Sequence, residues 1–349
     1  MMDTREYIDL LCKLIAIPSV SGSETAAANL LQSWMEERSL KVNRTVNNLW
    51  VDSDPLSDAP VLLLNAHIDT VKPAPSYTRD PFLPSVEGDF LYGLGSNDCG
   101  GSLVALLAAY RELSSREQPY RLIFSATAGE ENCAPDGIEI FLGEIPVPAL
   151  GIIGEPTGMQ MAVAEKGLMV LDCTSFGVSG HAAREEGVNA LYKALDDIQW
   201  FRSYAFPRVS DFLGPVKMSV TMIQCGVQHN VVPGECSFVV DVRPNGEYSN
   251  QEILSIIREN VGCEVKPRSL KHQSSSIAGD HPVVVRGLGM GLEAYGSPTT
   301  SNQTRCDFPT LKIGPGQSSR SHMADEYIRI SEIEQAVRVY VDLLDGLKI

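Results

Sequence analysis

The stretch VLLLNAHIDT, residues 61–70, carries a histidine and an aspartate two positions apart at the end of an apolar run. Residues two apart on an extended chain point to the same side. His67 can therefore bind a metal ion through one ring nitrogen while Asp69 accepts a hydrogen bond from the other, which fixes the tautomer of the ring and raises its basicity. Because so short a pair is more often an ordinary polar strand end, its interpretation depends on the rest of the chain.

Carboxylates follow two other predicted strands. The run RLIFSAT leads into AGEE, which contains Glu130 and Glu131, and the run LGII leads into GEPT, which contains Glu155. Strands that alternate with helices are typical of an α/β fold with a largely parallel sheet. Ligands of such sheets bind beyond the carboxyl ends of the strands. The sequence therefore predicts that these acids and His67 meet at one edge of a central sheet.

The residue types at this edge suit a metal ion. The candidate ligands are His67, Asp98, Glu130 or Glu131, Glu155 and His322. Histidine with carboxylates suits zinc, and so large a set suits two ions about 3.5–4 Å apart with a carboxylate between them. Because neighbours on an extended chain diverge, one of Glu130 and Glu131 can bind metal while the other serves as a general base on water. His229 and His281 also have the right type for ligands.

Several alternatives stay open on the residues alone. Three of the candidates also have an ordinary structural interpretation. These are Glu155 as a loop acid, Asp98 as a turn residue or helix cap, and His322 as a surface histidine. A serine hydrolase is disfavoured because the chain has no GxSxG motif, but a thiol nucleophile at Cys99 or Cys133 remains an alternative. A metal-binding module without catalysis is a third class, although it has no use for an unligated carboxylate beside the ions. The glycine-rich turn LYGLGSNDCGG lacks the Lys-Ser/Thr of a phosphate-binding loop.

The bulk composition bears on partners and compartment. The chain has 349 residues, 44% of them hydrophobic, and a formal charge of −16. This charge argues against nucleic acid and anionic membrane surfaces, both of which need basic patches. The eight scattered cysteines form no CxxC pair, so we expect reduced thiols in a cytoplasmic protein. We also expect no secretory signal in MMDTREYIDL and no bilayer-spanning segment.

The predicted elements divide the chain into two domains. Residues 1–164 and 273–349 read as the α/β catalytic domain. Residues 165–272 show the order βαββαβ, which predicts an inserted α+β, ferredoxin-like domain. The predicted helices are Thr4–Ile15, Ser23–Arg38 with Ser23 as N-cap, Ser102–Leu113, Asn189–Phe201, Ser249–Asn260, Pro282–Glu293 and Ser331–Leu347. Capping boxes are expected at Ser249 with Glu252 and at Ser331 with Glu334.

Eight motifs occur in an order and at separations that resemble one enzyme family. They are HIDT at His67, the glycine-rich turn with Asp98, AGEE at Glu130, GEPT at Glu155, SGHAA at His181, HNVVPG at Asn230, DVRP at Arg243 and SHMADE at His322. Over nearly the whole chain, this pattern resembles the co-catalytic zinc amidohydrolases that include acetylornithine deacetylase, succinyl-diaminopimelate desuccinylase, aminoacylase and carboxypeptidase G.

The resemblance implies a role for each metal-site residue. His67 and Glu155 would bind one zinc ion, Glu131 and His322 would bind the other, and Asp98 would bridge the two ions, for which cobalt can substitute. Glu130 would be the general base, and Asp69 would orient His67. The resemblance also implies a cis peptide bond between Asp98 and Cys99.

The resemblance implies that the inserted domain is a lid that pairs two copies of the chain. In such a homodimer, His181 would complete the partner's active site by donating a hydrogen bond to the reaction's oxyanion, with Asn230 assisting. Arg243 ends the predicted strand VVDVR, and its planar fork suits the α-carboxylate of a substrate. The alternative for Arg243 is a structural ion pair.

The activity implied is hydrolysis of an N-acyl amino acid, with N-acetylornithine in arginine biosynthesis as the first expectation. Desuccinylation of N-succinyl-diaminopimelate, deacylation of an acyl-citrulline and dipeptide cleavage are the alternatives. Two departures bear on this choice. Gly100 stands where the family often has lysine, and TTSNQTRCDF, residues 299–308, replaces the family's glycine-rich substrate loop.

Overall fold

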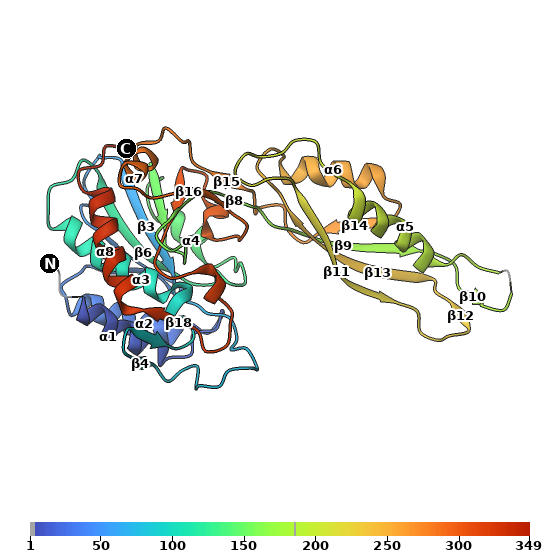
Figure 1. Cartoon of the computed structure of the whole chain (residues 1–349), viewed down its shortest axis with the longest axis horizontal. Coiled ribbons are helices and arrows are strands. Elements are labelled where there is room, and N and C mark those ends of the chain that lie inside the picture. The colour runs from blue at the N-terminus through green and yellow to red at the C-terminus, as the bar shows by residue number, and fades with distance from the viewer. Residues whose placement is uncertain (1–3, 185) are drawn as a thin grey trace. The chain divides into compact units, whose positions relative to one another are not determined.

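The computed structural model describes residues 4–184 and 186–349, which form two units (Figure 1). Unit 1 comprises the described residues up to 163 together with 277–295 and 301–349, and unit 2 comprises the described residues of 164–276 together with 296–300. The short segment 296–300 differs from the division expected from the sequence. It belongs to unit 2 because the Thr300 hydroxyl donates a hydrogen bond to the carbonyl of Lys166 and accepts one from Arg243.

A nine-stranded sheet has its central strands in unit 1, whereas its edge strand at residues 275–276 belongs to unit 2. Its order is β1-β2-β6-β3-β7-β17-β8-β15, and β16 also pairs with β8. The strands are β1 (Asn43–Thr45), β2 (Asn48–Asp52), β3 (Val61–His67), β6 (Arg121–Thr127), β7 (Leu150–Ile153), β8 (Met161–Glu165), β15 (Ser275–Ser276), β16 (Ala294–Ser297) and β17 (Thr310–Lys312). The four central strands, β6, β3, β7 and β17, are parallel, and β2, β8 and β15 pair antiparallel. The predicted α/β class with a mainly parallel centre is confirmed.

Helices cover both faces of this sheet, which explains why β3 is buried along its whole length. The helices of unit 1 are α1 (Arg5–Ile15), α2 (Thr25–Glu36), α3 (Gly101–Ser114), α4 (Ile138–Leu142), α7 (Pro282–Gly289) and α8 (Ile330–Leu344). Leu62 and Leu64 belong to the core that contains α3, whereas Val61 and Leu63 pack with Phe141 of α4. Helix α3 contacts β3, β6, α1 and α8 (Figure 1). It is apolar nearly all round because it is buried nearly all round.

Two helix starts in unit 1 differ from the prediction. Ser23 is not the N-cap of α2, which begins at Thr25 after Glu24. The expected capping box of Ser331 with Glu334 is also wrong. The hydroxyl of Ser331 donates to Asp89 instead (2.6 Å), and α8 begins directly after the three-residue strand that ends at Arg329. That strand, β18 (Tyr327–Arg329), forms a small sheet with β5 (Phe90–Tyr92) and β4 (Ser85–Glu87).

Unit 2 has the predicted order βαββαβ. Its elements are β9 (Met169–Phe176), α5 (Ala190–Ser203), β11 (Lys217–Cys225), β13 (Glu235–Arg243), α6 (Asn250–Asn260) and β14 (Glu264–Pro267), with a separate two-stranded sheet of β10 (Gly180–His181) and β12 (Val231–Val232). The four-stranded sheet is antiparallel in the order β11-β13-β9-β14. Helix α6 begins with the predicted capping box of Ser249 and Glu252. Burial alternates along β9 and β13, whose inner residues pack with α5 and α6.

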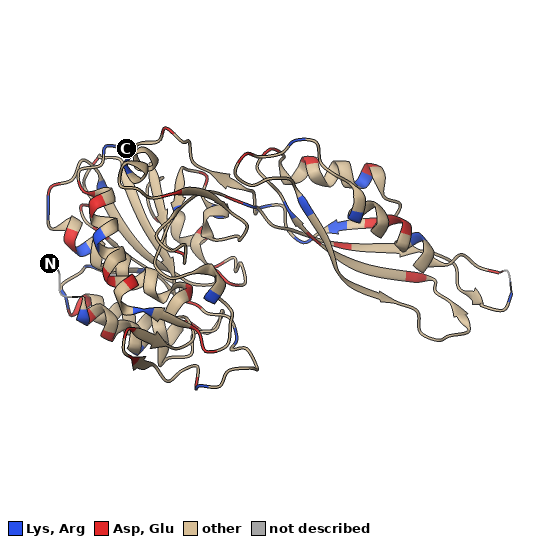
Figure 2. Cartoon of the chain, in the orientation of Figure 1, with Lys and Arg blue, Asp and Glu red and all other residues tan. Residues whose placement is uncertain are grey.

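Acidic and basic side chains are mixed on the surface of both units. Helices α1, α5 and α6 each carry side chains of both signs (Figure 2). Among the described residues, we find no helix with the length and apolar character needed to cross a membrane.

Candidate metal centre

The centre is built at the carboxyl end of β3, where His67 is buried with 2% of its surface exposed. Its Nε2 atom lies 3.2 Å from Oδ1 of Asp98 and 3.9 Å from Oε1 of Glu155. Its Nδ1 atom lies 2.8 Å from the backbone carbonyl oxygen of Asp69 and 3.5 Å from the Asp69 carboxylate. The backbone of Asp69 thus contacts the ring more closely than the side chain does. This arrangement leaves Nε2 directed at the acids.

The Asp69 carboxylate holds the turn that follows β6. Its Oδ1 atom accepts the backbone N–H of Glu130 (3.0 Å), and its Oδ2 atom accepts the backbone N–H of Glu131 (3.1 Å) and the hydroxyl of Ser21 (2.7 Å). Burial opposes ionisation here, but His67 and these hydrogen bonds lower the pKa of Asp69. An ionised Asp69 therefore ties the end of β3 to the two glutamates.

Asp98 lies between two histidines. It belongs to the turn Ser96–Gly100 before α3, and its peptide bond to Cys99 is cis, as the resemblance implied. Its Oδ1 atom is 3.2 Å from Nε2 of His67, and its Oδ2 atom is 3.5 Å from Nε2 of His322. One carboxylate thus has a different potential metal ligand near each of its two oxygens.

His322 is the most exposed of the five candidate ligands, and it lies against Glu131. Nε2 of His322 lies 3.0 Å from Oε2 and 3.2 Å from Oε1 of Glu131. The hydrogen bond to Glu131 raises the pKa of His322 to about 9. The imidazole therefore takes a proton at neutral pH when only the protein's own groups surround it, and a metal ion would compete with that proton for Nε2.

Two further acids, Glu130 and Glu155, lie half-buried beside these groups. Burial, with the nearby charge of Glu131, raises the pKa of Glu130 to about 8, although His67 opposes the shift. Burial and the charges of Asp98 and Glu130 raise the pKa of Glu155 well above its ordinary value. Such shifts are expected where carboxylates crowd together in a site with little water. A divalent cation among them would reverse the shifts and favour the ionised acids.

The donor atoms fit metal ions. One ligand atom from each of His67, Asp98 and Glu131 lies within 4.8 Å of the others, and the same holds for His67, Cys99 and Glu155. Nitrogen and carboxylate oxygen are ligands that zinc takes at about 2.0–2.2 Å. The five ligands predicted from the sequence and the resemblance, His67, Asp98, Glu131, Glu155 and His322, thus lie together in unit 1.

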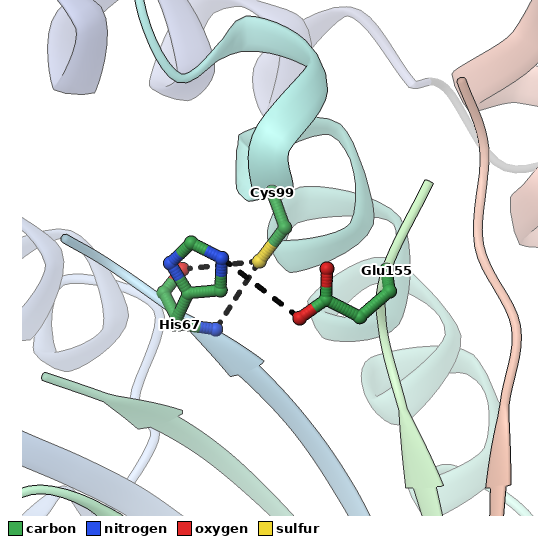
Figure 3. Close-up of side chains that lie close together, drawn as sticks. All are labelled: His67, Cys99 and Glu155. Atoms are coloured by element: carbon green, nitrogen blue, oxygen red, sulfur yellow. Dashed lines mark hydrogen bonds and ion pairs between the residues drawn. The ribbon is translucent and has the colours of Figure 1, made fainter. Parts of the chain in front are cut away.

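Cys99 lies beside this group but has another role in the fold (Figure 3). Its sulfur accepts the backbone N–H of His67 (3.2 Å) and lies 3.4 Å from the His67 carbonyl oxygen, to which the thiol donates. Burial raises the pKa of the Cys99 thiol to about 12. Because the thiolate is the reactive form, this geometry disfavours the alternative of a Cys99 nucleophile.

Three predicted residues lie in unit 2. His181 is exposed in β10, and its Nδ1 atom accepts the backbone N–H of Ala183 (3.0 Å). The side-chain Oδ1 atom of Asn230 is buried without a hydrogen-bond partner in the described part of the chain. Arg243 forms a two-point ion pair with Asp241, from Nε (2.8 Å) and from Nη2 (3.0 Å). The structural ion pair considered as an alternative for Arg243 is therefore present.

The sequence reasoning missed one buried acid near the centre. Glu326 accepts backbone N–H groups of the turn that carries Asp98. The sequence signal for Glu326 is its position in the motif SHMADE, four residues after the candidate ligand His322. The two other histidines considered as ligands belong to neither ligand group found among the described residues: His281 is the N-cap of α7, and His229 is exposed in unit 2.

Comparisons with known proteins agree with this geometry. The model of peptidase family M20/M25/M40 matches residues 63–346. An acetylornithine deacetylase of Proteus mirabilis is 28% identical over 374 residues, covering 97% of this chain and 96% of the relative. A succinyl-diaminopimelate desuccinylase of Stenotrophomonas maltophilia is 26% identical over 373 residues, covering 97% and 98%. A solved tripeptidase of Staphylococcus aureus matches with a TM-score of 0.79 at 18% identity, covering 99% of this chain and 98% of that one.

Proposed function

The chain belongs to peptidase family M20/M25/M40 and is a metal-dependent amidohydrolase, and on that premise we propose that it removes the acyl group of an N-acyl amino acid with two divalent ions. The observation that carries the proposal is the position of Asp98 between His67 and His322, at 3.2 and 3.5 Å from their Nε2 atoms. A carboxylate with a different partner on each oxygen is what a two-ion site requires.

The residues present would hold two ions. His67 and Glu155 would bind one, Glu131 and His322 the other, and Asp98 both. Zinc suits these donors, and cobalt can substitute for it. A solved peptidase of Bacillus subtilis, similar in fold with a TM-score of 0.74 at 14% identity over 98% of this chain and 97% of that one, is described as a dinuclear metal-binding peptidase. When bound, such ions polarise a carbonyl oxygen and lower the pKa of water to about 7.

Glu130 is the proposed general base. It is half-buried, and it lies outside both ligand groups of the described residues. Its carboxylate would take a proton from the attacking water and then deliver that proton to the nitrogen of the leaving amine. Asp69 would position it, since the Asp69 carboxylate accepts the backbone N–H of Glu130 at 3.0 Å. An unligated base beside the ligands disfavours a metal-binding module without catalysis.

N-acetylornithine is the first candidate substrate, with a role in arginine biosynthesis in the cytoplasm. The names of relatives at 26–28% identity support either this activity or desuccinylation of diaminopimelate. Acyl-citrulline and dipeptides are the further candidates of the same chemistry. The segment Thr299–Phe308 departs from the family pattern, and we expect it to influence this choice.

Unit 2 is the proposed lid and dimerisation domain. Strand β11 lies at the edge of its sheet and exposes Met222 and Ile223 at 65% and 52%. The neighbouring helix α5 exposes Tyr192 and Leu195. An edge strand with exposed apolar side chains is prone to pair with another chain. These residues support a homodimer formed through unit 2, in which His181 and Asn230 would contribute to the partner's active site.

A panel of acetyl, succinyl and formyl derivatives of ornithine, citrulline and diaminopimelate, assayed with zinc or cobalt, tests the proposed activity. We expect hydrolysis of at least one compound, with acetylornithine the fastest, and loss of the activity on exhaustive chelation. A dipeptide series serves as the comparison. Activity that survives complete removal of metal would contradict the proposal, as would a metal-loaded enzyme that hydrolyses none of these compounds.

The two adjacent glutamates should respond differently to substitution. Glu130→Ala should lower kcat by about 10²–10⁴ because the general base is lost, while the metal content stays at two ions. Glu131→Ala should lose one ion because Glu131 would be a ligand. Metal content by elemental analysis and single-substrate kinetics measure both effects. The reverse result, with one ion lost from Glu130→Ala and none from Glu131→Ala, would exchange the two roles.

Arg243 is proposed to bind the substrate α-carboxylate by exchanging its ion pair with Asp241. Arg243→Lys should then reduce kcat/KM much more for acyl-amino acids than for their α-amides, because only the acids need the planar fork. Asp241→Asn is the matched control, because it removes the competing ion pair and keeps the guanidinium. Equal losses on acids and amides would show that Arg243 only stabilises unit 2.

His181 can be tested in mixed dimers. His181→Ala and Glu130→Ala homodimers should each be nearly inactive, since one oxyanion donor contributes about 10²–10³ in kcat. After subunit exchange, each heterodimer should regain one working site, built from Glu130 of one chain and His181 of the other. Exchange is followed with chains that carry distinguishable tags. Complete exchange without recovered activity would rule out a role for His181 in the partner's site.

A further inference from the structure

Glu326 is a buried carboxylate that contacts backbone rather than ligand atoms. It is 2% exposed. Its Oε1 atom accepts the N–H groups of Asn97 and Asp98, both at 2.8 Å, and its Oε2 atom accepts the N–H of Gly95 at 3.0 Å. Both oxygens are thus directed at the turn before α3. Glu326 belongs to neither ligand group of the described residues, so its role is not that of the predicted ligands.

These hydrogen bonds determine where Asp98 points. Two consecutive N–H groups that converge on one oxygen fix the peptide planes on both sides of Asn97. The second of these planes leads directly into Asp98, so the hydrogen bonds hold one side of the backbone from which its side chain leaves and restrict where its carboxylate can lie. Its two oxygens then lie near His67 and His322, at 3.2 and 3.5 Å from their Nε2 atoms.

The same turn is attached to the loop that carries His322. Glu326 itself follows His322 by four residues. Asn97 adds a second attachment. Its Nδ2 atom donates to the carbonyl of Gln317 (3.1 Å) and to the hydroxyl of Ser321 (3.3 Å), and its Oδ1 atom accepts the N–H of Gln317 (3.0 Å). The turn and the loop are therefore braced together at the point where they face each other.

We propose that Glu326 is a positioning residue for metal binding, whose carboxylate holds Asp98 at the separation from His322 that two divalent ions require. The proposal rests on the proposed function because it takes Asp98 as the ligand shared by both ions. Outer residues that orient ligands typically change metal affinity 10- to 100-fold when they are replaced. A residue needed only for stability would lower the melting temperature and leave the affinity of the folded protein unchanged.

Titration of the metal-free full chain with Co²⁺ tests this role. Glu326→Gln keeps the side-chain volume, but its NH₂ group cannot accept the N–H of Gly95. We expect at least one Co²⁺ to bind 10- to 100-fold more weakly than in the wild type and the absorption spectrum of the bound Co²⁺ to change. Asp325→Asn is the matched control. Asp325 is the adjacent acid, and its carboxylate accepts backbone N–H groups of Thr78 and Arg79 instead. The Asp325→Asn protein should therefore bind Co²⁺ with the same affinity as the wild type.

The outcomes separate this inference from the proposed function. A folded Glu326→Gln protein with wild-type affinities and spectrum for two Co²⁺ would overturn the positioning role and leave the proposed function intact. A wild-type chain that binds no Co²⁺ would overturn both. If Glu326→Gln lacks the wild-type circular dichroism spectrum, Glu326→Asp replaces it, because aspartate keeps the charge but withdraws both oxygens by one methylene. A 10- to 100-fold loss of Co²⁺ affinity in Glu326→Asp supports the proposal, and wild-type Co²⁺ affinity in that variant overturns it.

Discussion

Crowding of carboxylates in a site with little water is the constraint on which this structure depends. Glu130, Glu131, Glu155 and Asp98 gather at one sheet edge, and desolvation, together with repulsion between the acids, raises the pKa values of Glu130 and Glu155. Like charges so close in a site with little water are unfavourable unless a cation lies among them. Until a cation binds, the surrounding structure must therefore hold the acids in place. Any loosening of that support would let the side chains turn away from one another.

Backbone N–H groups supply much of this support. The Asp69 carboxylate accepts the N–H groups of Glu130 and Glu131, and the Glu326 carboxylate accepts those of Asn97 and Asp98. In both cases an acid outside the predicted ligand set holds the backbone of a segment that supplies a candidate ligand. Hydrogen bonds of this kind to an ionised acceptor are stronger than neutral ones. They also act on the peptide planes and so leave the side chains of the held segment directed into the site.

The central sheet provides the rigid base for these turns. A buried polar network joins the ends of β3 and β6: the Asn65 side chain donates to Ser125 and Thr127, and the Asn302 side chain donates to Asn65 and Thr127. This network favours a single arrangement of the two strand ends, because the loss of any one of its hydrogen bonds would leave a buried donor or acceptor without a partner. The strand ends that carry His67 and the two glutamates are therefore fixed relative to each other.

The sequence predicted the parts of the site that local patterns encode. Apolar runs with no polar alternation indicated β3, β6 and β7, and the rule that ligands lie beyond strand ends brought His67, Glu131 and Glu155 together. Asp98 and His322 were candidates by residue type alone, and their roles came from family resemblance, because both lie on irregular turns whose geometry depends on contacts across more than 200 residues, such as that of Glu326 with Asp98. No local pattern encodes such a contact.

Local rules failed where a distant partner competed for the same side chain. Ser249 caps α6 as its motif predicts, because its hydroxyl accepts the N–H of Glu252 (3.2 Å). Ser331 has the same motif, yet its hydroxyl donates to Asp89 (2.6 Å), 242 residues away. A charge-assisted bond to a carboxylate is stronger than a neutral hydroxyl cap, so the distant partner prevails.

The segment Thr299–Phe308 departs most from the family pattern, and its contacts show how it can affect the chemistry. Asn302 is bound to the network at the ends of β3 and β6. Three residues later, Arg305 pairs with Glu139 and donates to the carbonyl of Cys133 (3.1 Å), in the loop that begins with Glu130 and Glu131. The segment is therefore attached to both sides of the glutamate pair. A sequence change here would therefore act on the backbone that carries the proposed base Glu130.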